Sequence, residues 1–560
     1  MDRRVSPISR RSFLRGTAGA VVVAGGVPAL LDACTNAENN GASTPSTSSK
    51  TGTLRVGWSS EPDTMNPMTT YSTEAQEILQ LVYDKLLDYD AHLNVIPGLA
   101  EKTAVSPDGN TITYSLRQGV LWHDGQPFSA ADVVFTLNLI KNKNLSQYAQ
   151  WLIDMTGVTA PDPNTVTVTF KKPQAFDPGL AIPILPQHIW KGMSAGAIQK
   201  FANAHPVGTG PFTFDSWQKG QTVTINRNPK FWGSAPAAAT VIWVLFQNED
   251  VMAQALRAGE VDILTEVPPT IWDGLKGASN LTPVSVDGFS FHHIGINVST
   301  NPKSGGNPLL HDVTVRQALS LAVDRNQLVA IALAGHGKPG SVLLPPAFDE
   351  YFLDIPADQQ LNNNPTKANQ ILDAGGYSKK NSAGVRLAPN GKPLEFRLIA
   401  IESTTVDVRA AQIFVDAAQK AGIKLNLQTM DENTLGAVVY NSDAPNWDIF
   451  VWGWDSGVND PDYLLGVPLS SQIGGNNDVY YANKTYDALY AQQSAELDKT
   501  KRVELVHQMQ QMYYENCAYI IMWYQAKLQA YTNKWKGWVD TPGGLVFNFS
   551  RANYLGVTPA

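Results

Sequence analysis

The residues best suited to bind a ligand lie in one short stretch near the C-terminal end of the chain. The candidate binding residues there are Trp452, Gly453, Trp454, Asp455, Asp460 and Tyr463. Carboxylates attract a cationic group, and aromatic rings stack on apolar or sugar surfaces. We expect residues 447–451 to form a buried strand, and the turn-forming residues after Asp455 to reverse the chain. Because residues at the carboxyl end of an internal strand face a crevice, the stretch predicts a ligand contact.

The same stretch has a plainer structural interpretation. Two tryptophans can belong to a core that is followed by a surface turn. We expect only one of Trp452 and Trp454 to face the crevice, where its ring would stack on a peptide side chain or on a sugar ring. The elements around the stretch have to distinguish the two interpretations.

The length and charge of the chain limit the class of protein. At 560 residues it is too long for one small core, which suggests roughly two to four compact units. The net charge is -8, and residues 1–33 contribute +3 of it through five arginines and two aspartates, so the rest of the chain carries -11. A chain this acidic is not expected to bind nucleic acid or an anionic lipid surface.

Residues 1–33 have the pattern of an export signal. Paired arginines at positions 10 and 11 precede Phe13 and Leu14, and a short run rich in glycine and alanine follows. The run is too short for a membrane span, and the arginine pair resembles a twin-arginine signal. We therefore predict a combined twin-arginine and lipoprotein signal peptide.

Cys34 lies where a bacterial lipoprotein signal is cut and its cysteine acylated. Leu31 and Ala33 fit that pattern, whereas Asp32 departs from it. We predict lipidation of Cys34, with an ordinary thiol as the alternative. Residues 34–52 are mostly small and polar, which predicts a flexible tether. The predicted location is the outer face of the cytoplasmic membrane, on the periplasmic or extracellular side, with a lipid anchor.

The folded part of the chain begins with the elements of an α/β unit. Residues 54–58 alternate between apolar and polar, which predicts a strand, and residues 75–86 carry apolar side chains at helical spacing. The loop between them holds Glu61 and Asp63. Further along, residues 111–128 indicate two short strands next to Asp-Gly turns.

Several motifs follow one another in the order of a known family. They are Pro-Val-Gly-Thr-Gly-Pro-Phe at 206–212, Asn-Arg-Asn-Pro-Lys-Phe-Trp at 226–232, Leu-Arg-Ala-Gly-Glu-Val-Asp at 256–262, and the runs at 315–325 and 372–377. With the strand and turn pattern of residues 97–132, this order resembles the family 5 solute-binding proteins of ABC importers. That family includes dipeptide, oligopeptide, nickel and some oligosaccharide receptors. The resemblance covers nearly the whole chain after the tether.

The resemblance implies a fold and a division of the chain. The fold class is α/β, namely a two-lobed periplasmic-binding-protein-like fold of type II, in its large three-subdomain variant, with hinge strands. The implied ranges are residues 53–290 and 525–560 for lobe 1, roughly 90–205 for its inserted subdomain, and 291–524 for lobe 2. Strands within residues 289–296 and 519–524 would carry the chain between the lobes.

The resemblance also implies a function. Members of the family enclose a ligand between closing lobes and present it to ABC permease subunits with cytoplasmic ATPases. Peptide receptors pair the main chain of the ligand with strands of both lobes. The matching positions here are the loop with Glu61 and Asp63 and the run from Trp452 to Asp455. We expect a monomer that captures short peptides, without a cofactor and without a nucleic-acid partner.

One position departs from the family pattern. Peptide receptors commonly hold the α-ammonium group of the ligand with an aspartate that aligns with Gly457, and Asp455 lies two residues earlier. Either Asp455 replaces that aspartate through a shifted loop, or the ligand has no N-terminal charge. An oligosaccharide receptor of the same family is therefore one alternative. A lipoprotein that keeps the receptor fold for signalling or interaction, without transport, is another.

Other reactive residue types point to no enzyme and no metal site. Ser194 lies in a Gly-x-Ser-x-Gly pattern, but no apolar strand precedes it, so a catalytic serine is not predicted. His292 and His293 would face opposite ways on a strand, and no metal-ligand motif accompanies them. Cys517 has aromatic neighbours and is expected to be a buried, inert thiol.

Overall fold

The computed structural model describes residues 52–560, apart from residues 71, 144–146 and 547–549. The described residues belong to a compact unit that spans residues 50–560. The predicted signal peptide, Cys34 and the predicted tether up to residue 51 lie outside the described residues. Gly52, which we expected at the end of the tether, is the first residue of the first strand.

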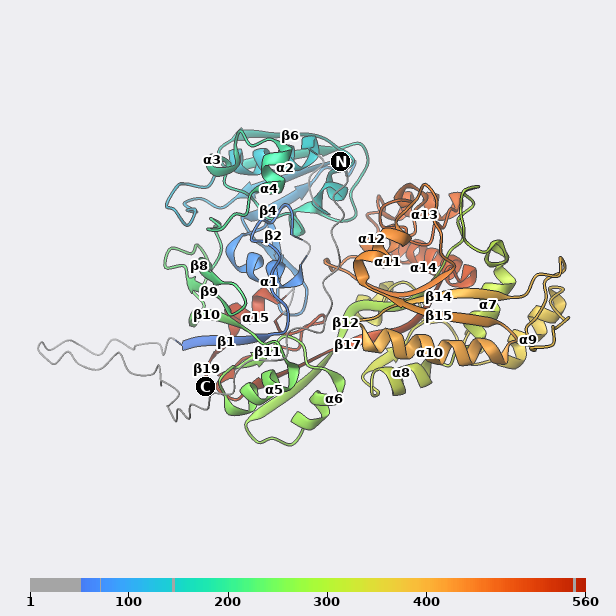
Figure 1. Ribbon diagram of the computed structural model, residues 1–560. Coiled ribbons are helices and arrows are strands. Elements are labelled where there is room, and N and C mark those ends of the chain that lie inside the picture. Colours follow the sequence, from blue (N-terminus) through green and yellow to red (C-terminus); the bar gives the residue numbers. More distant parts are fainter. Residues whose placement is uncertain (1–51, 71, 144–146, 547–549) are drawn as a thin grey trace, which may run out of the picture. The chain divides into compact units, whose positions relative to one another are not determined.

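One mixed sheet of 11 strands organises the described residues (Figure 1). Its order is β15-β14-β16-β12-β17-β11-β1-β10-β9-β8, and β13 pairs with β17 outside this path. The strands are β1 (Gly52–Trp58), β8 (Phe212–Gln218), β9 (Thr222–Arg227), β10 (Ala238–Leu245), β11 (Ile263–Leu264), β12 (Leu281–Ile296), β13 (Gly337–Pro339), β14 (Glu395–Ile401), β15 (Lys424–Met430), β16 (Ile449–Asp455) and β17 (Tyr519–Thr532). Parallel pairs occur near both ends of the order, between β1 and β10 and between β14 and β15, as an α/β fold requires.

The two longest strands of this sheet, β12 and β17, lie side by side and antiparallel (Figure 1). Residues 281–287 of β12 pair with 526–532 of β17, and residues 291–295 pair with 519–524. The register shifts between these two blocks. Both segments that we expected to carry the chain between lobes therefore lie in paired strands. These strands, β12 and β17, are 16 and 14 residues long.

A separate sheet of four strands is built from the first third of the chain. Its order is β4-β5-β7-β6, formed by β4 (Ala100–Val105), β5 (Thr111–Leu116), β6 (Met155–Asp162) and β7 (Thr165–Phe170). The prediction of a second strand within residues 111–128 is wrong. After β5 ends at Leu116, only one isolated bridge forms, between Leu121 and Pro127. Gly125 adopts φ +88°, and Asp124 accepts a hydrogen bond from the Gln126 amide, so a tight turn takes up the segment.

Helices and short strands surround the two sheets. The helices are α1 (Thr73–Val82), α2 (Ala130–Lys143), α3 (Gln187–Trp190), α4 (Ala195–Lys200), α5 (Glu249–Ala258), α6 (Pro269–Trp272), α7 (Val313–Ala322), α8 (Arg325–Ala332), α9 (Pro365–Ala374), α10 (Thr405–Lys420), α11 (Glu432–Val439), α12 (Asp462–Gly466), α13 (Lys484–Gln493), α14 (Lys499–Asn516) and α15 (Arg551–Gly556). The 3₁₀ helices are η1 (Gln147–Leu152), η2 (Pro178–Leu180), η3 (Asp273–Leu275), η4 (Pro308–His311), η5 (Pro346–Tyr351) and η6 (Ser470–Gln472). The short strands are β2 (Leu87–Tyr89), β3 (Val95–Pro97), β18 (Trp535–Lys536) and β19 (Thr558–Pro559). Side chains such as Ser72 and Asp498 accept amide hydrogen bonds at helix starts, which fixes where those helices begin.

Apolar side chains pack in separate clusters along the large sheet. One cluster surrounds β1, β10 and α1, and a second lies between the sheet and helices α7 and α10. A third, which we call the aromatic cluster, includes Phe289, Phe291, Phe450, Tyr513 and Tyr519. It lies against β12, β16, β17 and α14, and so supports the strand end that carries Asp455.

The first cluster encloses a carboxyl group, that of Glu77 on α1. Glu77 accepts hydrogen bonds from Trp58 Nε1 at 3.2 Å, from Trp243 Nε1 at 3.0 Å and from the Tyr554 hydroxyl. Burial raises the pKa of Glu77 to about 8, although these three donors oppose the shift. The folded protein therefore keeps this carboxyl protonated at neutral pH.

Glu77 gives a predicted pH dependence of stability. Its pKa is about 8 in the folded protein and near 4.5 in an unfolded chain, so the folded state binds an extra proton between these values and loses stability as pH rises through them. Replacing Glu77→Gln removes this dependence. From pH 5 to pH 8, urea unfolding should show the wild type losing on the order of 3 kcal/mol more than the variant. Equal losses in both proteins would exclude Glu77 as the source.

Candidate functional site

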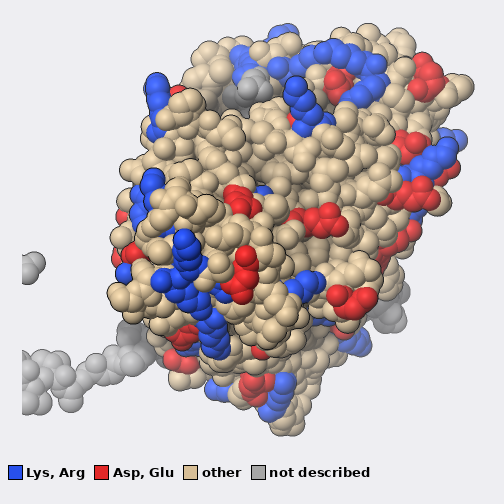
Figure 2. All heavy atoms as spheres, turned by 90° about the vertical axis from the view of Figure 1, so that its right-hand side faces the viewer, with Lys and Arg blue, Asp and Glu red and all other residues tan. Residues whose placement is uncertain are grey.

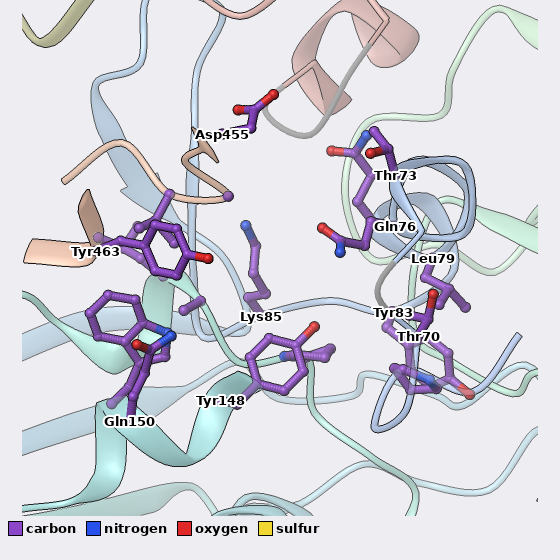
Figure 3. Close-up of a pocket in the computed structure, with 18 residues that line it drawn as sticks. Thr70, Thr73, Gln76, Leu79, Tyr83, Lys85, Tyr148, Gln150, Asp455 and Tyr463 are labelled. Atoms are coloured by element: carbon purple, nitrogen blue, oxygen red, sulfur yellow. The ribbon is translucent and has the colours of Figure 1, made fainter. Parts of the chain in front are cut away.

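A cavity of about 270 Å³ lies among segments that are far apart in the sequence (Figure 3). One side comes from α1 and the loops around it, including Thr70, Gln76, Tyr83 and Lys85. Another comes from η1 and η2, and a third from the stretch after β16. The residues from these last segments are Tyr148, Gln150, Trp151, Leu180, Ala181, Pro183, Asp455, Gly457, Val458 and Tyr463.

The structure brings two of the sequence-predicted residues into this cavity. Asp455 and Tyr463 line it, and so does Gly457, the position at which the family pattern has an aspartate. An added Cβ at Gly457 would meet no atom within 4 Å, so the cavity is open there. Ser456 accepts the Val458 amide and donates to the Val458 carbonyl, which holds the turn that presents these residues.

Asp455 faces a cation contributed by β17, which lies beyond β12 in the sheet. Its carboxylate lies 3.9 Å from Nζ of Lys527 on β17, and its side chain is 42% exposed. Burial raises the pKa of Asp455, and the Lys527 ammonium opposes this. Burial alone would lower the pKa of Lys527. The carboxylates of Glu266, Asp455 and Glu74 outweigh this effect, so the pKa is raised. Three carboxylates therefore share this one ammonium group, which leaves an excess of negative charge.

Glu74, at the start of α1, belongs to the same group of charges. Burial raises its pKa, and the carboxylates of Glu266 and Asp63 add to the shift. A raised pKa means that the negative form lacks sufficient compensation in the protein. The Asp455 side of the cavity therefore favours a cationic group on a ligand.

Trp452 and Trp454 point to the same side of β16, so our expectation that only one faces the crevice was wrong. Residues two apart on a strand share a face, and both rings pack against the aromatic cluster. Trp454 Nε1 donates to Asp478 Oδ2 and to the Tyr519 hydroxyl, each at 3.2 Å. Burial raises the pKa of Asp478 to about 7. Neither ring is among the residues that line the cavity.

His292 and His293 face opposite sides of β12, as predicted. His292 stacks on Trp523, and its Nδ1 lies 2.8 Å from Asp407, whereas His293 is buried against the aromatic cluster. Gly453 lies opposite His292, and an added Cβ there would come within 3.1 Å of the imidazole Nε2. Gly453 thus provides space for the histidine.

The remaining sequence-predicted residues lie outside the cavity lining. Glu61 accepts hydrogen bonds from Trp217 Nε1 at 2.9 Å and from the Gly220 amide at 2.8 Å. Asp63 accepts hydrogen bonds from the Thr64 amide and the Thr70 hydroxyl, which anchors a loop next to the cavity. Asp63 also acts electrostatically on Glu74, so it contributes to the excess negative charge.

Asp460 has an ion-pair partner inside the protein. Arg502 of α14 binds both its carboxylate oxygens, at 2.7 and 2.8 Å, and the two side chains are only 10% and 6% exposed. Asp462 lies beside this pair and accepts a hydrogen bond from Gln493, and burial raises its pKa to about 6. The pair fixes the turn that follows Asp455.

Arg502→Met should therefore destabilise the protein. It leaves the buried Asp460 carboxylate without its cation, which typically costs about 3–5 kcal/mol. Lys499→Ala, on the same helix, removes only an exposed ion pair with Glu350 and should cost less than about 1 kcal/mol. Urea unfolding of both variants measures the difference. A cost for Arg502→Met no greater than that for Lys499→Ala would contradict a structural role for the pair.

Other chemistry considered from the sequence has structural explanations. Ser194 caps α4 by accepting the Ala197 amide. Cys517 is buried, and burial raises the pKa of its thiol to about 11, as expected for an inert cysteine. Within the described part of the chain, no group of three or more potential metal ligands is found, and no helix is both long and apolar enough to span a membrane. On the face in Figure 2, acidic and basic side chains lie in small groups, several of them mixed, within broad uncharged areas.

Sequence reasoning missed several residues of the cavity. Lys85 and Tyr148 line it, and Lys527 and Glu266 set the charge around Asp455. None of the four lies in a motif, because their proximity depends on how distant segments fold together. The alternation of β17 could have indicated that Lys527 lies among apolar strand neighbours, but not that it faces Asp455.

The fold and the cavity define a solute-binding protein, and comparisons with known proteins agree. The family model of the bacterial extracellular solute-binding proteins, family 5, matches residues 94–476. Protein XP55 of Streptomyces lividans is 28% identical over 488 residues, which are 86% of this chain and 85% of that protein. The oligopeptide-binding protein AppA of Bacillus subtilis is 26% identical over 534 residues, which are 93% of this chain and 96% of AppA.

Two solved structures have the same fold. The structure of AppA from Bacillus subtilis in complex with a nonapeptide gives a TM-score of 0.76 at 26% identity, over 91% of this chain and 99% of that one. NikZ from Campylobacter jejuni in complex with Ni(L-His) gives a TM-score of 0.76 at 25% identity, over 90% of this chain and 99% of that one. The chain belongs to the bacterial extracellular solute-binding proteins, family 5. Its fold is the predicted α/β, two-lobed fold of type II, in the large variant with hinge strands.

Proposed function

We propose that the protein is the extracytoplasmic substrate-binding lipoprotein of an ABC importer and captures short peptides between two closing lobes. The observation that carries this proposal is the charge around Asp455. Three carboxylates share the ammonium group of Lys527 beside the cavity, so a further cation is favoured there. The α-ammonium group of a peptide supplies such a cation.

The proposed capture uses the division of the chain expected from the sequence. Lobe 1 is residues 53–290 and 525–560, with an inserted subdomain at roughly 90–205, and lobe 2 is residues 291–524. Asp455 and Tyr463 then reach the cavity from lobe 2, while α1 and η1 line it from lobe 1. A ligand in contact with both lobes stabilises the closed state over the open one.

The remaining predicted ligand contacts act through the elements that hold the cavity. Trp452, Gly453 and Trp454 support the end of β16, and Asp460 fixes the turn after it. Glu61 and Asp63 anchor the loop that precedes α1. In this proposal Asp455 takes the place of the aspartate that the family pattern has at Gly457.

The proposed location and partners follow from the N-terminal segment and from the family. A twin-arginine signal over residues 1–33 exports the protein, Cys34 carries the lipid, and the tether holds the folded part at the outer face of the cytoplasmic membrane. The protein acts as a monomer and delivers its ligand to ABC permease subunits with cytoplasmic ATPases. The relative AppA, named as an oligopeptide-binding protein, supports peptides as the ligand class.

A second candidate is an oligosaccharide ligand. Aromatic side chains of Tyr148, Trp151 and Tyr463 line the cavity, and such rings stack on sugars as well as on peptide side chains. The excess negative charge at Asp455 favours the peptide, because a neutral sugar leaves that charge uncompensated.

Binding measurements on the full-length protein test the proposal. Isothermal titration with a free tripeptide, its N-acetylated form and cello-oligosaccharides should give saturable binding that is strongest for the free tripeptide. Asp455→Asn should weaken the binding of that tripeptide by about 2–5 kcal/mol, because the peptide ammonium loses a partly buried partner. Equal binding of the acetylated form would reject the ammonium contact, and saturable binding of sugars alone would reject peptides.

Gly457→Asp is the complementary variant. The open space at this position accepts a side chain, and a carboxylate there would add a second contact to the ligand ammonium. We expect the free tripeptide to bind about 1.5–3 kcal/mol more tightly. Gly457→Asn, which has the same size without the charge, is the control and should gain much less. An equal gain in both variants would mean that the charge of the side chain at position 457 does not determine the affinity for the tripeptide.

A further inference from the structure

The cavity also presents a cation, from a different segment of the chain than Asp455. Lys85 lies in the short connection between α1 and β2, and its side chain is 18% exposed. Figure 3 shows this side chain extended into the cavity that Asp455 also lines. The two charged residues come from different parts of the chain.

The ammonium group of Lys85 lies 5.8 Å from the centre of the Tyr89 ring and, among the described residues, has one carboxylate partner within ion-pair distance. Its ion pair with Asp88 has an N–O distance of 3.6 Å, which is longer than a good hydrogen bond. Asp88 is shared with Arg551, whose Nε lies 3.3 Å from it. Arg551 in turn binds Asp84. The nearby carboxylates are therefore arranged around Arg551 rather than around Lys85.

The second carboxylate in this group, Asp84, forms hydrogen bonds with other groups and acts on Lys85 electrostatically. Besides Arg551, it accepts hydrogen bonds from Thr209 Oγ1 and Trp232 Nε1, each at 2.7 Å. Burial lowers the pKa of Lys85, and Arg551 adds to this effect, although Asp88 and Asp84 oppose it. An ammonium group has three donors, so one that points into a cavity favours an anionic ligand atom there.

We infer that Lys85 binds a carboxylate of the ligand, so that the ligand is a short zwitterionic peptide with its free amino terminus at Asp455 and its free carboxyl terminus at Lys85. The inference rests on the proposed function, because it takes the ligand ammonium to be at Asp455. A ligand with both charges compensates the excess negative charge around Lys527 and the loosely paired Lys85 at the same time. It also bridges two segments that only folding brings together.

The size of the cavity agrees with a short peptide. Its volume of about 270 Å³ is just below the range of roughly 300–1,000 Å³ that is usual for drug-sized ligands. Free termini at both ends give such a ligand the charge pattern that Asp455 and Lys85 complement.

The test compares trialanine with its C-terminal amide and its N-acetylated form, by isothermal titration of the full-length protein. We expect wild type to bind the free acid at least about tenfold more tightly than the amide, since a charge-assisted contact is lost. Lys85→Met keeps the aliphatic stem and should remove this preference, because it weakens the binding of trialanine and leaves the binding of the amide unchanged. Lys85→Arg keeps the charge and should retain the preference. Thermal unfolding of each variant confirms that it is folded.

The outcomes separate this inference from the proposed function. Equal binding of acid and amide by wild type, or an unchanged preference in Lys85→Met, overturns the role of Lys85 while leaving peptide binding intact. Discrimination against N-acetylated trialanine reports on Asp455 independently and should persist in Lys85→Met. Failure of wild type to bind any form of trialanine overturns the proposed function and the inference together.

Discussion

The antiparallel pairing of β12 with β17 is the constraint on which the rest of the structure depends. The ladder breaks after residue 287, and there an added Cβ at Gly288 would come within 2.7 Å of the Gln525 carbonyl oxygen. The two backbones thus approach closely where the register shifts. Lys527 lies just beyond this break on β17, while Asp455 is held on the other side of β12 by pairing with Ser290. The position of the break therefore decides which charges meet at the cavity.

Charged groups are paired or neutralised in the core, but those at the cavity are not fully compensated. Arg502 and Asp460 form a closed pair with two hydrogen bonds, and the carboxyl of Glu77 is held neutral by burial. At the cavity, by contrast, the carboxylates around Lys527 exceed the available ammonium groups. Uncompensated charge in a partly buried site costs stability. In the proposed function, a ligand of complementary charge offsets that cost, which favours the liganded protein over the empty one.

Patterns of local sequence predicted much of the fold but less of the site. Apolar alternation located β1, the order of motifs pointed to the family, and the resemblance to that family indicated both crossing strands. Asp455 was found because it ends an internal strand. The partner of Asp460 was not predictable, because Arg502 is 42 residues away and meets it only after α14 packs. Lys85 escaped notice for the same reason, since a single lysine in a loop has no periodic signal.

That the ligand spans the cavity from Asp455 to Lys85 can be tested directly. The measurement is a structure of the protein with trialanine bound. The ammonium nitrogen should lie within about 3 Å of the Asp455 carboxylate, with the peptide carboxylate next to Lys85. A peptide bound in the reverse direction, or bound outside the cavity, would contradict the account.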